Sequence, residues 1–475
     1  MNSHDVERNS STSGLPVAPG LGPTLEKAGV LRHRKSLDRR SLYIMALSAL
    51  IALVIAPIAR LLVYLIGVIT NLAFYGRFSG ELTSPSDHHL GIWAVLVPVV
   101  GSLIVGVMAR YGSQAIRGHG IPEAMEQILT NESRIPARMT FLKPLSAAIT
   151  IGTGGPFGAE GPIIATGGAL GSLLGQLIHV TGQERKTLLA AGAAAGMTAI
   201  FGTPFSAILL AIELLVFEFR PRSFIPVTVA ALTAMVLRPA LFGAEPLFHV
   251  AALPVASGEA MFAYGGEGLI MGVLAIAISR SIYLIEDLFE KLPIHWMWWP
   301  ALGGLCVGIV GLIEPHTMGV GYDNIDRILS GHFVGAALAV FCVWKFLSWS
   351  IALGSGTSGG TLAPIFTIGG GAGVLIGEGL QMLLPGAGVN LTMCALIGMA
   401  ASFAGASRAL FASLVFALEI TQQFNSLLPL LAGCSAAFVV SALAMKTTIM
   451  TEKLVRRGQH VPSEYIPDSH HAGQA

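Results

Sequence analysis

Long stretches without a single charged residue limit most strongly how this chain can fold. The shorter of these stretches are residues 90–109, 161–183, 187–212, 292–313 and 420–445. A membrane-spanning helix needs about 20 apolar residues, so each of these stretches is long enough to cross a bilayer. Two longer stretches, 346–377 and 379–407, are interrupted by Gly and Pro, which indicates helices that stop partway through the membrane.

The composition of the chain supports the same interpretation. Only 12% of its 475 residues are charged, whereas about a quarter of the residues of a soluble protein are charged. We therefore predict an all-α integral membrane protein, because a transmembrane barrel would show short alternating segments instead. Lys plus Arg number 28 and Asp plus Glu number 27, so the charge balance gives no sign of nucleic-acid binding. No sequence motif indicates a metal site or a cofactor.

Polar residues separate the chain into three parts. Residues 1–41 form a polar, Arg-containing tail, residues 42–457 one membrane domain, and residues 458–475 a second short tail. Lys and Arg residues flank the membrane domain at both ends, and the positive-inside rule then places both termini in the cytoplasm. The pair His470-His471 in the second tail is too short a pattern to predict a metal site.

The membrane domain contains an internal repeat. Residues 167–175 resemble residues 369–377 at an offset of 202, and residues 191–213 match residues 397–419 at an offset of 206. A duplication of Gly- and Pro-interrupted helices is typical of membrane transporters, whose binding site lies near the membrane midplane between the two repeats.

Three segments combine glycines with a proline that can open a helix. They are residues 118–122, 158–162 and 360–364. Proline fits the first turn of a helix, and glycine lets the backbone approach a ligand closely. Helix N-termini carry free N–H groups and a partial positive charge. Several such ends that meet inside a membrane would bind an anion without a full positive charge.

The same three segments resemble the signature sequences of the CLC family of chloride channels and proton/chloride antiporters. The residues from Glu213 to Arg220 and from Lys453 to Arg457 fit this pattern as well. The resemblance covers nearly all of 42–457 and implies two inverted structural repeats of tilted and partial helices. It also implies a homodimer with one pore in each subunit, which transports chloride or a similar monovalent anion and is not an enzyme.

The resemblance assigns a role to individual residues. Glu160 corresponds to the gating glutamate of the family. The positions that would bind the anion are His119, Gly120, Ile121, Ala159, Gly161, Thr361, Leu362 and Met450. The internal proton-transfer position of the antiporters corresponds to Leu214, and Glu213 precedes it.

At several of these positions the chain departs from the family pattern. Ala159 replaces a basic residue, Leu362 replaces a Phe, and Met450 replaces the Tyr whose hydroxyl usually reaches the central anion. Leu214 replaces the proton-transferring Glu and cannot carry a proton. We therefore expect passive or weakly proton-coupled anion flux, with a proton/chloride antiporter as the alternative. His119 replaces a common Ser; it is either a plain loop residue or a group that contacts the anion or titrates.

Glu160 also has an interpretation that does not depend on the family. A carboxylate beside a helix N-terminus imitates an anion and can occupy its site, and protonation removes that charge and frees the site. An ionisable residue inside a membrane is a functional candidate by default. Glu213 and Glu419, in contrast, recur at matched positions of the repeat, which favours a structural role for both.

An intramembrane serine protease is the alternative from a different class. Residues 356–360 fit the pattern Gly-x-Ser-x-Gly around Ser358. A nucleophilic serine needs a histidine base within reach, and the only histidines after Ser358 lie close to the end of the chain, at 460, 470 and 471. This distribution argues against the protease.

Overall fold

The computed structural model of the protein describes residues 37–459 and 461, so the His470-His471 pair and most of both tails lie outside the described residues. The described part of the chain is helical and contains no β-strand. The first half holds α3 (Arg39–Tyr75), α4 (Leu96–Tyr111), α5 (Ile121–Thr130), α6 (Met139–Gly152), α7 (Glu160–Leu177), α8 (Gly182–Phe201), α9 (Pro204–Leu210) and α10 (Pro221–Phe242). The second half holds α11 (Gly258–Glu290), α12 (Trp299–Ile313), α13 (Tyr322–Leu329), α14 (Gly335–Gly354), α15 (Leu362–Leu383), α16 (Leu391–Ser407), α17 (Leu410–Thr421) and α18 (Leu427–Ala444), and α19 (Glu452–Arg456) follows.

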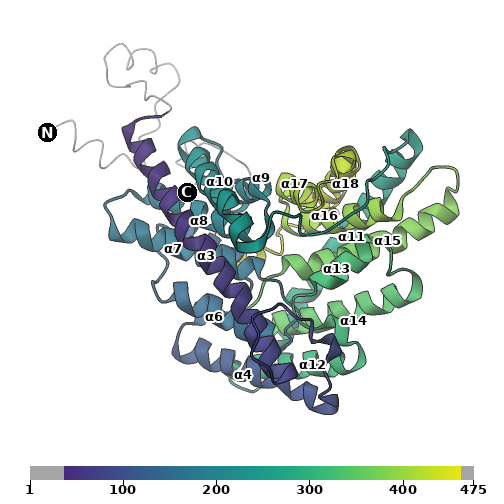
Figure 1. The fold of residues 1–475 in the computed structure, drawn as a ribbon, viewed down its shortest axis with the longest axis horizontal. Helices are drawn as coiled ribbons and strands as arrows, with labels where there is room; N and C mark the ends of the chain where they lie inside the picture. Colours follow the sequence, from purple (N-terminus) through teal and green to yellow (C-terminus); the bar gives the residue numbers. More distant parts are fainter. Residues whose placement is uncertain (1–36, 460, 462–475) are drawn as a thin grey trace, which may run out of the picture.

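The helices of the two halves correspond in order. A long helix opens each half, α3 with 37 residues and α11 with 33. A short helix comes third in each half, α5 with 10 residues and α13 with 8. In Figure 1 the first half, purple to teal, lies on the left and the second half, green to yellow, on the right, with α9 and α17 packed against each other between them. This arrangement agrees with the predicted internal repeat.

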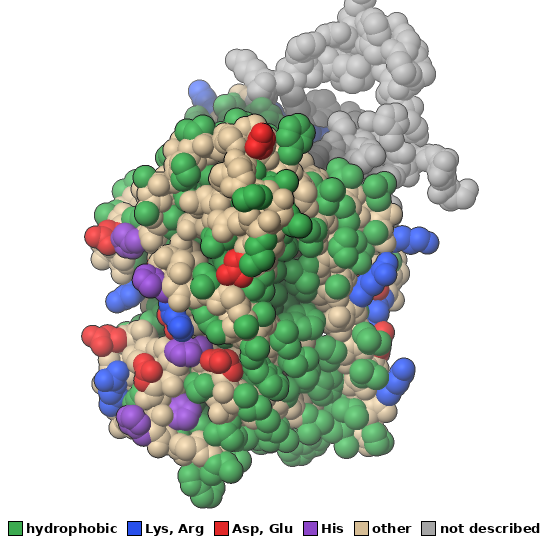
Figure 2. Space-filling model, turned by 90° about the vertical axis from the view of Figure 1, so that its right-hand side faces the viewer, with side chains coloured by type: hydrophobic (Ala, Val, Ile, Leu, Met, Phe, Trp, Pro, Cys, Tyr) green, Lys and Arg blue, Asp and Glu red, His purple; other side chains and the backbone are tan. Residues whose placement is uncertain are grey.

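Eight helices among the described residues are long and apolar enough to cross a membrane. They are α3, α4, α10, α11, α12, α14, α15 and α18, some of them extended by a short 3-10 turn. In the view turned by 90°, hydrophobic side chains form a band between two margins that carry most of the charged side chains (Figure 2). A membrane-embedded protein has this distribution, because charged side chains are costly inside a bilayer.

Glycines of the repeated motif allow two pairs of helices to pack closely. A Cβ at Gly167 of α7 would lie 2.1 Å from the carbonyl oxygen of Gly192 in α8, and a Cβ at Gly369 of α15 would lie 2.6 Å from that of Gly398 in α16. Small residues allow such close approach of membrane helices, which associate through packing. The two matched glycine pairs therefore bring α7 onto α8, and α15 onto α16, at equivalent places in the two halves.

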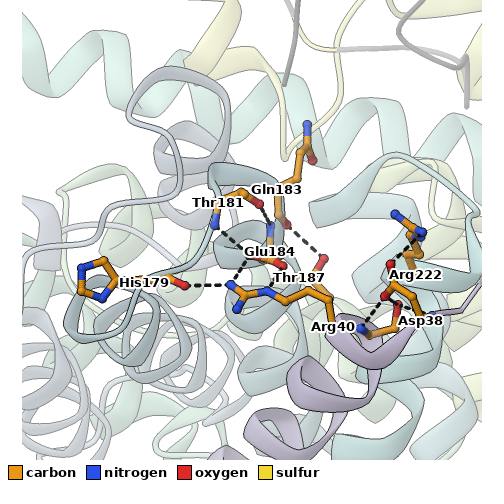
Figure 3. A network of polar contacts seen from close by, with 9 residues as sticks. Asp38, Arg40, His179, Thr181, Gln183, Glu184, Thr187 and Arg222 are labelled. Atoms are coloured by element: carbon orange, nitrogen blue, oxygen red, sulfur yellow. Dashed lines mark hydrogen bonds and ion pairs between the residues drawn. The ribbon is translucent and has the colours of Figure 1, made fainter. Parts of the chain in front are cut away.

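The first membrane helix begins at Arg39, three residues before the predicted start of the membrane domain at residue 42. Asp38 caps this helix by accepting a hydrogen bond from the Ser41 amide, so residues 39–41 belong to α3. Figure 3 shows how Arg40 then joins α3 to the start of α8. Arg40 donates to the Glu184 carboxylate at 2.6 Å and to the His179 carbonyl at 2.7 Å.

Candidate anion site

Three helices begin at the centre of the molecule, where the two halves meet. These helices are α5, α7 and α15, and they begin at the three predicted Gly- and Pro-containing segments. The Gly118 amide, before α5, donates to the Thr357 carbonyl, before α15, at 3.1 Å. Gly158, before α7, and Gly360, before α15, exchange two backbone hydrogen bonds of 3.2 and 2.9 Å. The structure thus brings all three segments together.

Close contact between these segments depends on glycine. A Cβ at Gly161, in the first turn of α7, would lie 1.9 Å from the His119 carbonyl oxygen. Gly120 has a φ of 96°, in the region that favours glycine, and a Cβ there would lie 2.5 Å from the Gly161 carbonyl oxygen. Three helix N-termini therefore converge, and their free N–H groups and dipoles favour an anion.

Glu160 is the first residue of α7, and its side chain fills the space between these segments. Only 2% of the residue is exposed. Its Oε1 accepts a hydrogen bond of 3.1 Å from the Tyr322 hydroxyl, and its Oε2 is buried without a hydrogen-bond partner among the described residues. A Cβ at Gly158 would lie 1.7 Å from Oε2, and a Cβ at Gly360 would lie 2.8 Å from it. The carboxylate is therefore packed between the glycines that precede α7 and α15.

The structure places the other predicted anion-binding residues in the interior. The buried residues are His119, Gly120, Ile121, Ala159, Gly161, Thr361, Leu362 and Met450. Gly120, Ala159 and Thr361 are the N-caps of α5, α7 and α15. The amides that follow each cap have no carbonyl partner within their own helix, so they can donate to an anion.

A small cavity of about 40 Å³ lies beside His119. Tyr283 and Ile449, the residue before Met450, line it, and the Tyr283 hydroxyl donates to the Ile449 carbonyl at 2.7 Å. The Nδ1 atom of His119 is buried without a hydrogen-bond partner in the described part of the chain. Sequence reasoning missed Tyr283, because this residue lies on α11, far along the chain from the recognised segments. In space, however, Tyr283 lies next to Met450, the position where the family pattern has a Tyr.

Glu213 and Glu419 cap each other's neighbouring helices. The Glu213 carboxylate accepts from the amides of Phe411 and Ala412 at the start of α17, both at 3.0 Å. The Glu419 carboxylate accepts from the amides of Phe205 and Ser206 at the start of α9, at 3.0 and 2.8 Å. A carboxylate at a helix N-terminus stabilises that helix. The matched positions in the sequence repeat therefore have matched contacts in the structure.

Leu214, at the predicted proton-transfer position, lies in a π-helical turn, Ala211–Val216, and is 4% exposed. Its side chain offers no group that can bind a proton. The carboxylate of the neighbouring Glu213 is already hydrogen-bonded to the start of α17, so Glu213 does not offer a free acidic group in place of the missing one.

Two buried lysines form a second matched pair that sequence reasoning missed. Lys143 of α6 donates to the carbonyls of Ile116 and Gly118, both at 2.8 Å. Lys345 of α14 donates to the Thr317 carbonyl at 2.8 Å. The two lysines are 202 residues apart, the offset of the sequence repeat, and that offset is the signal that could have identified them. Lys143 places a positive charge beside the loop that carries His119.

The fold and the site define a class of protein. Membrane proteins with two related halves, partial helices and convergent helix ends at their interface are transporters, and this site suits an anion. The family model described as "Voltage gated chloride channel" matches residues 100–442. The chain therefore belongs to the CLC family of voltage-gated chloride channels, as the sequence segments predict.

Relatives with known names cover most of the chain. A ClcB-like chloride channel protein of Ralstonia nicotianae is 28% identical over 369 residues, which are 77% of this chain and 86% of the relative. The H⁺/Cl⁻ exchange transporter ClcA of Salmonella arizonae is 28% identical over 464 residues, which are 92% of this chain and 95% of the relative.

Solved structures share the fold. A slow cyanobacterial Cl⁻/H⁺ antiporter superposes with a TM-score of 0.78 at 22% identity and covers 89% of this chain and 98% of its own. A CLC-type fluoride/proton antiporter gives a TM-score of 0.72 at 20% identity, over 84% of this chain and 95% of its own. These likenesses confirm the predicted fold class, an all-α membrane protein with CLC-like repeats.

Proposed function

We propose that the protein exchanges chloride for protons across the membrane, and that Glu160 is the gate that both ions share. The observation that carries this proposal is the position of the Glu160 carboxylate, packed between Gly158 and Gly360 where α7 and α15 begin. A carboxylate at convergent helix N-termini occupies the place of an anion. When it takes up a proton, its charge is lost and the place becomes available to chloride.

The names of the relatives favour exchange over the passive flux expected from the sequence. The relative that covers the largest share of the chain among those given above is an H⁺/Cl⁻ exchanger. Passive flux is the second candidate. In the family pattern, the residue at position 214 transfers protons and the residue at position 450 closes the inner end of the anion path, and here Leu214 and Met450 replace them. Under the exchange proposal, protons reach Glu160 from the inner side along water and not through Leu214.

The remaining expectations also become proposals. We infer a homodimer that forms through α9, α17 and α18, whose apolar side chains Phe205, Phe411 and Leu428 are 67%, 54% and 63% exposed in the single chain. Packing drives such association in lipid. A mass measurement in mild detergent at micromolar concentration should give twice the chain mass of 49.6 kDa, and a monomer alone would contradict the dimer.

The orientation of the chain rests on its flanking charges. Lys and Arg residues beside both ends of the membrane domain support cytoplasmic termini, with 1–38 and 458–475 as tails. A membrane-impermeant reagent should therefore modify a tag at either end only after the cells are opened. Modification of intact cells would contradict this orientation.

Exchange is tested by imposing a chloride gradient on liposomes that contain the purified protein. Under the proposal, chloride movement drives protons against their own gradient at a fixed ratio, and a protonophore collapses the proton signal. Chloride flux without uphill proton movement would favour the passive candidate. Absence of any chloride flux would contradict both.

A further inference from the structure

A ligand-sized cavity lies beside the anion path, between α5, α6 and α19. Its volume is about 300 Å³, at the lower end of the range for pockets that hold small molecules. The charged residues that line it are Arg117, Lys143, Lys453, Arg457, Glu123 and Glu126. We call this space the side cavity. It is distinct from the cavity of about 40 Å³ beside His119, although Arg117 and Lys453 line both.

Two of the four cations in the side cavity are paired with acids. Lys453 lies 3.4 Å from Oε1 of Glu123, and Arg457 donates to both carboxylate oxygens of Glu126 at 2.6 Å. Burial alone would raise the pKa of Glu123, but the cations of Lys453 and Lys143 hold it well below its usual range. Each of the two acids therefore pairs with one cation, and two of the four cations in the lining have no acidic partner in the side cavity.

Arg117 is the cation that a ligand can still reach. Its guanidinium has no hydrogen bond or ion pair among the described residues, and its Nε is buried without a partner. Lys143, the other unneutralised cation, already donates to two backbone carbonyls. A guanidinium without an acceptor in a sheltered site favours a carboxylate or phosphate, to which it can donate two parallel hydrogen bonds.

The guanidinium of Arg117 is also held in one place. It lies over the rings of Trp296 and Trp299, 4.9 and 5.6 Å from their centroids, and cation–π contacts of this kind stabilise a cation. Gly356 borders it on another side, because a Cβ there would lie 2.5 Å from Nη2. A donor fixed before the ligand arrives binds at a lower entropic cost.

Apolar side chains complete the lining and indicate the rest of the ligand. Ile135, Met139 and Ala165 contribute apolar surface to the side cavity. Inorganic ions gain nothing from such surface, whereas the hydrocarbon part of an organic acid does. The combination of a fixed cation and apolar walls therefore selects an anion with an apolar body.

We propose that the side cavity binds a small organic acid whose carboxylate sits on Arg117, and that the bound acid slows chloride passage. Arg117 also lines the small cavity beside His119, so an anion bound to it reduces the positive potential at that end of the path. The regulatory part rests on the proposed function, whereas binding itself does not. The acid comes either from water or from the fatty acids of the membrane, which share the carboxylate.

Binding is tested by calorimetric titration of the full chain in detergent with benzoate. We expect saturable binding that is at least about tenfold weaker in Arg117→Gln and that is unchanged in Arg280→Gln, whose guanidinium donates to the Ala444 carbonyl outside the side cavity. Ala165→Leu should also weaken binding, because it fills the cavity without a change of charge. Equal benzoate affinity in the wild type, Arg117→Gln and Ala165→Leu would overturn the proposal.

Two comparison ligands test whether the site requires both the charge and the apolar body of benzoate. Benzyl alcohol lacks the charge and inorganic phosphate lacks the apolar body, so neither should displace benzoate at equal concentration. Displacement by either one at benzoate's own affinity would overturn the assignment. Displacement of benzoate by oleate in lipid vesicles would identify the natural ligand as a membrane fatty acid. No displacement by oleate would identify it as a water-soluble acid. In both cases the carboxylate of the ligand binds Arg117.

Regulation is tested separately in liposomes. Benzoate on the side that carries α19 should lower the chloride efflux of the wild type severalfold and leave that of Arg117→Gln unchanged. Efflux that is unaffected while benzoate binds would overturn the regulatory part alone. If no variant transports chloride, the proposed function fails, and the calorimetric result still decides whether the site exists.

Discussion

The Tyr322 hydroxyl donates a hydrogen bond of 3.1 Å to Oε1 of Glu160, across the boundary between the two halves of the chain. The ring of Tyr322 packs edge-on against Phe201 and Phe248, with centroids 6.1 and 6.3 Å away. These contacts keep the hydroxyl in place at the start of α13. Because Oε2 of Glu160 has no partner among the described residues, Tyr322 holds the carboxylate in its observed position through a single side-chain hydrogen bond.

Tyr322→Phe should make the gate open more easily. A hydrogen bond to a charged group contributes about 1.5–3 kcal/mol, so its loss should shift the closed-to-open balance by about tenfold or more. The expected result is a severalfold rise in chloride efflux from liposomes at pH 7.5. Tyr75→Phe is the control, since it removes a hydrogen bond to the Ser84 carbonyl away from the site. Unchanged efflux in Tyr322→Phe would show that the hydroxyl does not hold the gate.

Glu213→Gln should destabilise the protein without uncoupling it. The amide keeps one acceptor for the start of α17 but loses the charge, and a helix cap of this kind contributes about 1–2 kcal/mol. Glu419→Gln is the matched control, because Glu419 makes the same contacts to the start of α9. Thermal unfolding in detergent should show similar losses for both variants, with the proton-to-chloride ratio unchanged. Loss of proton movement in Glu213→Gln alone would instead place Glu213 on the proton path.

The three helix starts could be predicted from the sequence because local chemistry determines them. Glycines and prolines at 118–122, 158–162 and 360–364 restrict the backbone wherever the chain folds. The partners of Glu160, in contrast, depend on how distant helices pack. Tyr322 follows Glu160 by 162 residues, and no local pattern marks it.

The matched pair of Lys143 and Lys345 was within reach of sequence reasoning but was missed. Both lie at the offset of the repeat, yet each stands alone in an apolar segment. A single buried lysine is recognised as part of the site only when the carbonyls that it contacts are known. The start of α3 also depends on a contact that the sequence analysis did not predict. Asp38 caps the helix, and α3 therefore begins inside the predicted tail.

Lys143→Met should weaken chloride binding. A unit charge several ångströms from an anion contributes on the order of 1–4 kcal/mol at an effective dielectric constant near 20, so the apparent affinity for chloride should fall by about tenfold or more. Lys143→Arg retains the charge and should recover part of the affinity. Concentration-dependent chloride uptake into liposomes measures this. Equal apparent affinities for all three proteins would contradict an electrostatic role for Lys143.

The contact between α3 and α8 should stabilise the protein in a pH-dependent way. Burial would raise the pKa of Glu184, but the hydrogen bond from the Arg40 guanidinium, with further donors, holds it below its usual range. A carboxylate whose pKa is lowered by folding adds stability above its ordinary pKa, and this stability disappears as the pH falls through the folded value.

Arg40→Ala should therefore lower the free energy of unfolding by about 0.5–1 kcal/mol at pH 7, the size expected for a partly exposed ion pair. The difference from the wild type should shrink below about pH 4, where Glu184 takes up a proton. Thermal unfolding at pH 7 and pH 3.5 checks this, with Arg77→Ala, just beyond the other end of α3, as the control. A difference that is the same at both pH values would contradict the ionic origin of the contact.

Simultaneous recording of chloride and proton movement in liposomes with Glu160→Gln tests most directly whether Glu160 is the shared gate. The amide imitates the protonated side chain, so the account predicts chloride flux that is the same at about pH 5 and at about pH 8 and that occurs without proton movement. Glu259→Gln is the matched control, because Glu259 also lies in the first turn of a helix but is exposed, and it should behave like the wild type. Chloride flux in Glu160→Gln that keeps the pH response and proton movement of the wild type would contradict the account.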